Sequence, residues 1–589
     1  MKYFYLIFSL YSLWLLGLPV HYVMVASASA PLVGKHSLAN HNSSATPLKT
    51  AFVHAQNRHL MVNGKPIVLK GINFSNNYEQ DLTSLDLLNS THHSEHDYQR
   101  VKNLGFNSIR FAFNGNWYEQ KPKDFWTWLD HNIALAKRHQ LYLILDMHVP
   151  IGGYWLNTAS EKLDFRIWSD PHIQQRNLAL WQAIAQRYKN ETVIAAYDIL
   201  NEPVTTDDTG EQWQQLAQAL VDVIRSVDQN HLIIVGRVYG THQSYQAKIA
   251  KKQFLVNDDN VMYDFHFYEP IIYTHQYASW ITSPLGDGGR YPDANRLIPT
   301  GEQVLLATTS DKSPNIVNGN SDWTEYSSEL IKITDPKIKA AFPTLVVRGA
   351  MQGQVYFDDF SVTEYDESGH FVQEVINEPL SAQTIWQWWD WIKPTNQTPL
   401  TTFVRLVNDG FNDAFSLSIA NVYGSKSTAG WSSDTVWFQT KLGYQYRIKG
   451  HMKGTNVQLN HPSGHVGFEL DLYGAKAGNK NSFMVRDKNY LRHEFMKFFL
   501  FGIDHDVPMS VMEFGLMRQC FEQRAKGGRQ WVADMLDIFR EHATSFAYWN
   551  YHGNHMGLYL TSNRTPPGQP NLPLLTILKQ KLTQWPDMR

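Results

Sequence analysis

The chain has 589 residues, more than one hydrophobic core usually supports, so we expect two domains or one large domain with an insertion. Its formal net charge is −3 and its acidic and basic residues are interspersed. This distribution argues against a nucleic acid partner, because it predicts no basic face that could follow a phosphate backbone.

The N-terminus has the pattern of an export signal. Residues 3–25 are almost entirely apolar, follow Lys2 and precede Ala26-Ser27-Ala28, a small-residue cleavage pattern. We predict a signal peptide at residues 1–28, a flexible linker at 29–50, and a secreted, periplasmic or extracellular protein that leaves the membrane after cleavage. An uncleaved membrane anchor is the alternative, since the stretch is long enough to span a bilayer.

From residue 51 onward, short apolar runs alternate with helical patterns, which is typical of β/α units. In one such helical pattern, Trp213, Leu216, Leu220 and Ile224 recur at spacings of three and four residues. Eight runs predict strands: 67–74, 108–113, 141–148, 193–200, 232–238, 261–267, 509–514 and 546–551. We predict an α/β fold, a (β/α)8 TIM barrel, with a doubly wound open sheet as the alternative.

The alternation is interrupted between the sixth predicted strand and the helix that begins near Asn489. The intervening sequence alternates apolar and polar residues, and Gly, Asn, Ser and Asp separate the runs, which indicates antiparallel β-structure. We therefore predict an all-β jelly-roll sandwich at residues 295–480, inserted between strand 6 and helix 6 of a barrel formed by residues 51–294 and 481–589. The insertion should begin at the barrel face that carries active sites.

Two glutamates lie at the ends of predicted strands four and seven. Glu202 is part of Asn201-Glu202-Pro203, and Glu513 is followed by Phe514-Gly515. Both carboxylates should therefore face each other at the C-terminal rim of the barrel. Such a pair suits hydrolysis of a glycosidic bond, which needs one protonated acid and one ionised carboxylate.

The polar residues at the strand ends resemble those of glycoside hydrolase family 5 in identity and order. They are Arg110 on strand two, His148 on three, Asn201 and Glu202 on four, His266 and Tyr268 on six, Glu513 on seven and Trp549 on eight. The resemblance implies a retaining enzyme that needs no cofactor and cuts β-linked polysaccharide, foremost an endo-β-1,4-glucanase (cellulase). A β-mannanase, a xyloglucanase and another β-glucanase remain open.

The resemblance also implies a role for each residue. Glu202 would be the general acid/base and Glu513 the nucleophile, which Arg110 and Tyr268 keep ionised. We therefore expect a lowered pKa for Glu513 and, in a less polar part of the cleft, a raised one for Glu202. The supporting roles are sugar 2-hydroxyl binding by Asn201, substrate binding or tuning of Glu202 by His148 and His266, a stacking platform at Trp549 and lining of the cleft by Trp155.

Two further patterns imitate functional sites. Asn377-Glu378-Pro379 repeats the acid/base tripeptide inside the insertion, where no barrel strand precedes it, so we predict that Glu378 is not catalytic. A cluster of His92, His93, Glu95 and His96 has metal-ligand residue types, but we expect a solvated loop that opens the first helix.

The insertion resembles jelly-roll carbohydrate-binding modules at residues 354–363 and 408–423, in an order that implies a circularly permuted module. By this resemblance Asp358 and Asp359 are candidate ligands of a structural calcium, with solvated acids as the alternative. Four tryptophans at 386, 388, 389 and 391 could meet sugar, but we expect burial at the domain junction.

The rival functions are a barrel that binds carbohydrate without cleaving it and an anchored adhesin. We expect a monomer.

Overall fold

The computed structural model describes residues 51–79, 93–155, 163–241, 252–278, 286–316, 318–381, 386–391, 403–424, 427–433, 435–460, 464–476, 482–560 and 568–585. The predicted signal peptide and linker lie outside these residues. None of the helices in the described ranges is both long and apolar enough to cross a membrane.

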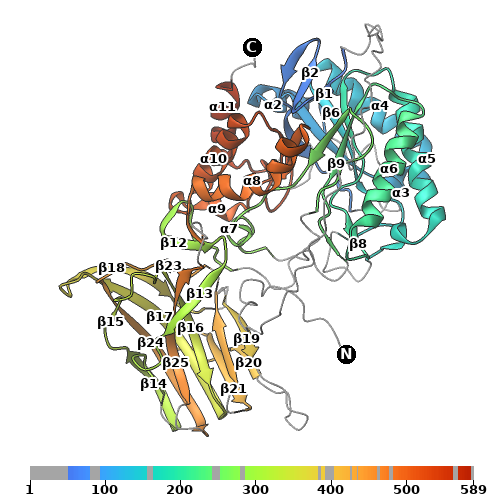
Figure 1. The fold of residues 1–589 in the computed structure, drawn as a ribbon. Coiled ribbons are helices and arrows are strands. Elements are labelled where there is room, and N and C mark those ends of the chain that lie inside the picture. Colours follow the sequence, from blue (N-terminus) through green and yellow to red (C-terminus); the bar gives the residue numbers. More distant parts are fainter. Residues whose placement is uncertain are drawn as a thin grey trace, which may run out of the picture.

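Eight parallel strands form a closed barrel (Figure 1). The closure confirms the TIM barrel over the open sheet. Nearly every residue of these strands is buried, which explains their continuous apolar runs. In barrel order the strands are β4 (Lys70–Phe74), β5 (Ser108–Asn114), β6 (Tyr142–Val149), β7 (Ile194–Asp198), β9 (Leu232–Gly236), β11 (Val261–Asp264), β27 (Met509–Phe514) and β28 (Ser545–Tyr548).

The helices cover the outside of the barrel with their apolar faces (Figure 1). In α6, Trp213, Leu216, Leu220 and Ile224 are all buried, as their spacing predicts. The helices are α2 (Glu95–Leu104), α3 (Gly115–Gln120), α4 (Pro122–Arg138), α5 (Pro171–Tyr188), α6 (Glu211–Arg225), α7 (Ile271–Thr274), α8 (Lys488–His505), α9 (Gln519–Glu522), α10 (Gly528–Glu541) and α11 (Leu572–Thr583).

The first predicted strand was wrong in its extent. Residues before 68 belong to a small antiparallel sheet of β1 (His54–Gln56), β2 (His59–Val62) and β3 (Lys65–Ile67). Its turns use Asn57, Asn63 and Gly64 at positive φ, a conformation that Asn and Gly tolerate. Val68 and Leu69 are buried between β3 and β4, so the apolar run continues across the boundary and conceals it.

Two antiparallel sheets lie between β11 and α8, where the insertion was predicted (Figure 1). They enclose a core of their own. One sheet contains β12 (Asp293–Pro299), β13 (Gln303–Thr308), β16 (Ala340–Arg348), β19 (Gln387–Trp391), β22 (Thr428–Ser432), β23 (Phe438–Gln439), β25 (His465–Ala475) and β26 (Phe483–Arg486). The other contains β14 (Gly319–Ser327), β15 (Ile331–Lys332), β17 (Met351–Tyr365), β18 (Phe371–Glu378), β20 (Phe403–Val407), β21 (Ser416–Val422) and β24 (Gln445–Leu459).

The two segments that connect the barrel to the insertion pair with each other as strands. Strand β12 runs antiparallel to β26, with Pro299 opposite Phe483 and Asp293 opposite Arg486. The β-structure therefore extends a few residues beyond 295 and 480 at both ends. This pairing ties the sandwich to the barrel by a two-stranded connection.

Several predictions inside the insertion concern individual side chains. Asp358 accepts hydrogen bonds from the backbone N–H of Phe411 (2.7 Å) and of Asp359 (2.9 Å), so protein donors engage both its oxygens. A structural calcium there stays a prediction, which metal analysis of the purified protein would test.

Trp386 is buried but Trp388 is 43% exposed, so the expectation of complete tryptophan burial was wrong. The side chain of Trp391 lies outside the described residues.

The histidine cluster before α2 is neither a metal site nor a solvated loop in its described part. His93 is buried and stacks on Phe74, with ring centroids 3.5 Å apart. Glu95 forms ion pairs with Arg138 and His139 instead of meeting His93. His92 lies outside the described residues. The solvated-loop expectation was therefore wrong for His93, whose ring packs among aromatic neighbours.

Candidate active site

The structure brings Glu202 and Glu513 together at the C-terminal ends of β7 and β27. One oxygen of each carboxylate and one ring nitrogen of His266 lie within 4.8 Å of one another. In retaining glycosidases the two carboxyl groups are about 5 to 5.5 Å apart, which leaves no room for a water between them. Such a trio could also suit a metal, but a metal ion there would lie close to the Arg110 guanidinium that pairs with Glu513 and would meet a like charge.

Arg110 organises the floor of the site from β5, where it is 1% exposed. Its Nη1 donates to Glu513 Oε1 (2.9 Å), its Nε to Asp198 Oδ2 (2.8 Å) and its Nη2 to Asn201 Oδ1 (2.7 Å). Nη2 also lies 3.1 Å from Asp146 Oδ1. A guanidinium suits this position because its donors diverge in a fixed plane. Arg110 therefore fixes Asn201 and Glu513 relative to each other.

Glu513 is held from its other side as well. The Tyr268 hydroxyl donates to Oε2 at 2.9 Å, and His266 Nδ1 lies 3.5 Å from the same oxygen. The Glu513 side chain is buried. Both carboxylate oxygens are thus fixed, which is the arrangement expected for a group that must approach a substrate atom in one orientation.

His266 connects Glu202 to a buried aspartate. Its Nδ1 is 2.7 Å from Glu202 Oε1, and its Nε2 is 3.3 Å from Asp264 Oδ2. Asp264 in turn accepts hydrogen bonds from the Met512 backbone N–H and the Ser510 hydroxyl. These contacts fix the His266 ring and place its imidazole beside both carboxylates.

The pKa directions in the substrate-free protein reverse the sequence-based expectation. Burial lowers the pKa of His266, but the charge of Glu513 and its bonds to Asp264 and Glu202 outweigh burial and raise the pKa to about 10. Burial raises the pKa of Glu202, yet the hydrogen bond and charge of His266 leave it lowered. Burial raises the pKa of Glu513 more than His266 and Arg110 lower it. The proton shared by Glu202 and His266 therefore rests on the imidazole.

We expect the His266→Gln variant to lose stability in a pH-dependent way. The pKa of His266 is raised on folding from its ordinary value of about 6.5 to about 10, so its charge stabilises the fold fully below pH about 6.5. This contribution disappears as the pH rises through about 10. Urea unfolding of wild type and variant should therefore give a difference in unfolding free energy that shrinks between pH 6 and 10. A difference that stays constant or grows over this range contradicts a cationic His266.

His148 and Trp549 form the opposite wall. His148 Nδ1 is 2.6 Å from Asp146 Oδ2, and its Nε2 is 3.3 Å from Asn201 Nδ2. Its ring stacks on that of Trp549 with centroids 5.2 Å apart. Burial lowers the pKa of His148 to about 3, so this ring is neutral. Trp549 remains partly exposed beside it, as a stacking platform requires.

Trp155 does not have the predicted place in the cleft wall. It is 2% exposed, and its Nε1 donates to the backbone carbonyl of Glu202 at 2.7 Å. Glu202 has φ of +40°, a costly conformation for a residue other than glycine. Trp155 therefore supports the strained backbone of Glu202 instead of offering its ring to a sugar.

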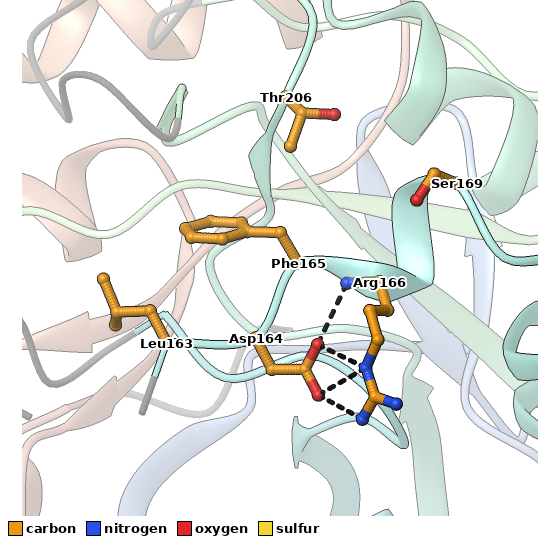
Figure 2. Close-up of a pocket in the computed structure, with 6 residues that line it drawn as sticks. All are labelled: Leu163, Asp164, Phe165, Arg166, Ser169 and Thr206. Atoms are coloured by element: carbon orange, nitrogen blue, oxygen red, sulfur yellow. Dashed lines mark hydrogen bonds and ion pairs between the residues drawn. The ribbon is translucent and has the colours of Figure 1, made fainter. Parts of the chain in front are cut away.

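An open pocket of about 570 Å³ has a lining that includes Asp164, Phe165, Arg166 and Thr206 (Figure 2). Phe165 lines it and stacks on Trp155 at 6.2 Å, and Thr206 follows Glu202 by four residues. Asp164 and Arg166 pair on its rim. The pocket combines one aromatic ring with charged and hydroxyl groups.

Sequence analysis missed the buried acids Asp146, Asp198 and Asp264. Asp146 and Asp264 each precede a predicted histidine by two residues, which places both members of a pair on the same side of their strand. Asp198 lies in the otherwise apolar run of β7. An acidic residue within a largely apolar predicted barrel strand was the signal that could have revealed all three.

The chain is similar to curated proteins over about a third of its length. It is 30% identical over 199 residues to endoglucanase C of Acetivibrio thermocellus, which covers 33% of this chain and 55% of that protein. Against cellodextrinase A of Ruminococcus flavefaciens the identity is 28% over 220 residues, or 36% and 62% of the two chains. The chain thus spans a little over half the length of these relatives.

Solved structures and a family model give the remaining comparisons. Cel5A of Thermotoga maritima in complex with cellobiose aligns over 87% of this chain and 97% of its own at 16% identity, with a TM-score of 0.42. The family model described as cellulase (glycosyl hydrolase family 5) matches residues 60–333 and 349–555, well over half of the sequence. The chain therefore belongs to the cellulase family, glycosyl hydrolase family 5.

Proposed function

We propose that this chain is a retaining glycoside hydrolase that cleaves β-linked polysaccharide, foremost an endoglucanase that cuts β-1,4-glucan. The observation that carries this proposal is the approach of Glu202 and Glu513 to within 4.8 Å. This separation suits direct attack by one carboxylate while the other transfers a proton. A purely carbohydrate-binding barrel would not need both carboxylates in this geometry.

In the first step, Glu513 attacks the anomeric carbon, and the bond to the glycosidic oxygen breaks as Glu202 donates a proton to it. In the second step, Glu202 takes a proton from water, the water oxygen bonds to the anomeric carbon and Glu513 is released. For Glu202 to act as an acid, the proton on His266 must first move along their 2.7 Å contact. Asn201 would bind the sugar 2-hydroxyl, and Trp549 would stack under the ring.

The family and the names of its relatives support a cellulase, because endoglucanases and a cellodextrinase are among them. A β-mannanase, a xyloglucanase and another β-glucanase are the alternatives within the same mechanism. The proposed chemistry needs no cofactor. From the N-terminal pattern we propose export to the periplasm or medium, and we propose that the protein acts as a monomer.

We expect the first product of hydrolysis to retain the anomeric configuration of the substrate. Two displacements at one carbon restore its configuration, and the short carboxylate separation favours this route. Proton NMR of the fresh product tests this, with a polysaccharide panel that includes glucans, mannan and xyloglucan. An inverted first product would overturn the mechanism. Cleavage of mannan alone would change the proposed substrate and leave the mechanism intact.

A further inference from the structure

A second cavity, of about 590 Å³, lies at the junction between the barrel and the inserted sandwich. Tyr277, in the loop after α7, and Lys526, in the short 3-10 helix that follows α9, line its barrel side. The end of β18 and the turn after it form its other side, including Glu378. Figure 1 shows α7, α9, β12 and β18 gathered between the two bodies. The cavity is therefore on the catalytic side of the barrel.

Some charged groups around this cavity are already paired. Arg290 lies 3.4 Å from Asp293, and Lys526 forms an ion pair with Asp287. Within the described ranges, Arg296, Arg486 and Glu378 have no ion-pair partner at such a distance. The Arg296 guanidinium donates only to the backbone carbonyl of Val375 among the described groups. Of these three side chains, Arg296 and Glu378 are partly exposed and can meet a ligand.

Arg486 is the most unusual of the three because it is only 1% exposed. Its Nη1 donates to the Gly288 carbonyl at 2.8 Å, but its Nε has no hydrogen-bond partner in the part of the chain that the structure describes. Burial lowers the pKa of both Arg486 and Arg296 and raises that of Glu378, so their environment compensates these charges poorly. Buried donors without a partner are rare because each one costs free energy unless water or a ligand accepts a hydrogen bond from it.

The balance of charge indicates the class of ligand. Four basic residues (Arg290, Arg296, Arg486, Lys526) and four acidic residues (Asp287, Asp293, Glu374, Glu378) line the cavity. An ion of either sign would meet like charges there. A sugar hydroxyl can both accept from a guanidinium and donate to a carboxylate, so a saccharide can bind charged groups of both signs. The volume is also within the usual range for small-ligand sites.

We propose that this junction cavity binds sugar units of the polysaccharide substrate, with Arg296 as donor and Glu378 as acceptor. The proposal rests on the proposed function, since it extends the substrate site across the domain junction. Glu378, whose tripeptide imitates the acid/base motif, would then bind substrate without taking part in bond cleavage. The sandwich would contribute to the choice of polymer through this shared site.

Kinetics of the full chain test the proposal. Glu378→Ala and Arg296→Gln should each lower kcat/KM on polymer about tenfold, mainly through KM, because each removes a hydrogen bond from a charged group. Their activity on a small aryl β-glycoside should remain unchanged. The matched control is Glu325→Ala on β14, an exposed acid that pairs with Lys449 in the same sandwich. Thermal unfolding of each variant verifies that it is folded.

Unchanged polymer kinetics in both junction variants would overturn the proposal, as would an equal loss on polymer and aryl glycoside. A crystal of the Glu513→Gln variant soaked with a disaccharide provides a readout that does not require turnover. Sugar density against Glu378 and Arg296 supports the site, and an empty junction cavity beside an occupied catalytic cleft overturns it. If the wild-type protein cleaves no polysaccharide, the proposed function fails by a separate measurement.

Discussion

Glu513→Gln should lower kcat on every substrate by about 10⁴-fold or more, because it removes the only group placed to bond with the anomeric carbon. An amide preserves the hydrogen bond from Tyr268 and nearly the same shape. The loss would therefore report the missing nucleophile and not a collapsed site. Steady-state kinetics on polymer and on an activated aryl glycoside measure it. The Glu513→Ala variant, whose shorter side chain leaves space for azide, should regain activity when azide is added. The product should be a glycosyl azide of inverted configuration.

Glu202→Gln provides the contrast. It should slow substrates with poor leaving groups by about 10² to 10⁴-fold and affect the first step less for an activated leaving group, which departs without full protonation. Glu378→Gln serves as the matched control for an Asn-Glu-Pro glutamate and should leave aryl glycoside turnover unchanged. A wild-type rate in Glu513→Gln, or a large aryl glycoside defect in Glu378→Gln, would contradict the assignment of roles.

Arg110→Met should destabilise the fold by about 3 to 5 kcal/mol, the largest stability loss that we expect from one substitution in the site. The variant leaves Asp146, Asp198 and Glu513 buried without their shared cation. Burial already raises the pKa of Asp146 to about 6 and that of Asp198 to about 7 against the effect of Arg110. Without the guanidinium these acids should take up protons or unfold the barrel. Urea unfolding at pH 8 and pH 5 measures the loss, which should be smaller at pH 5, where more of the acids are protonated.

Arg138→Gln is the appropriate control, because Arg138 pairs with Glu95 on the surface, where the two side chains are 60% and 48% exposed. Exposed ion pairs contribute between about 0 and 1 kcal/mol. A loss in Arg110→Met no greater than that in Arg138→Gln would show that Arg110 does not hold the buried acids in place.

Local patterns were sufficient to predict the barrel and the position of its insertion. The strands of a covered parallel barrel are apolar on both faces, so they are visible as short runs, and α6 shows its buried face by its spacing. Glu202 and Glu513 could be identified because parallel strands end at the same rim. The first strand failed for the same reason, since the buried residues Val68 and Leu69 made β3 and β4 look continuous.

The sequence by itself determined which residues reach the active rim, because strand order and alternation assign each strand-end side chain to that face. Only the tertiary structure decided their charges. His266 stands between two carboxylates and against Asp264, so its pKa rises and it lowers that of Glu202, contrary to what a lone acid in a cleft would show. The structure also decided that Trp155 supports Glu202 from a buried position. It placed Glu378 beside Arg296 and Arg486 in one cavity. These contacts join residues that are remote in the chain, and electrostatic energies depend on the distance and burial of such groups, which no local pattern contains.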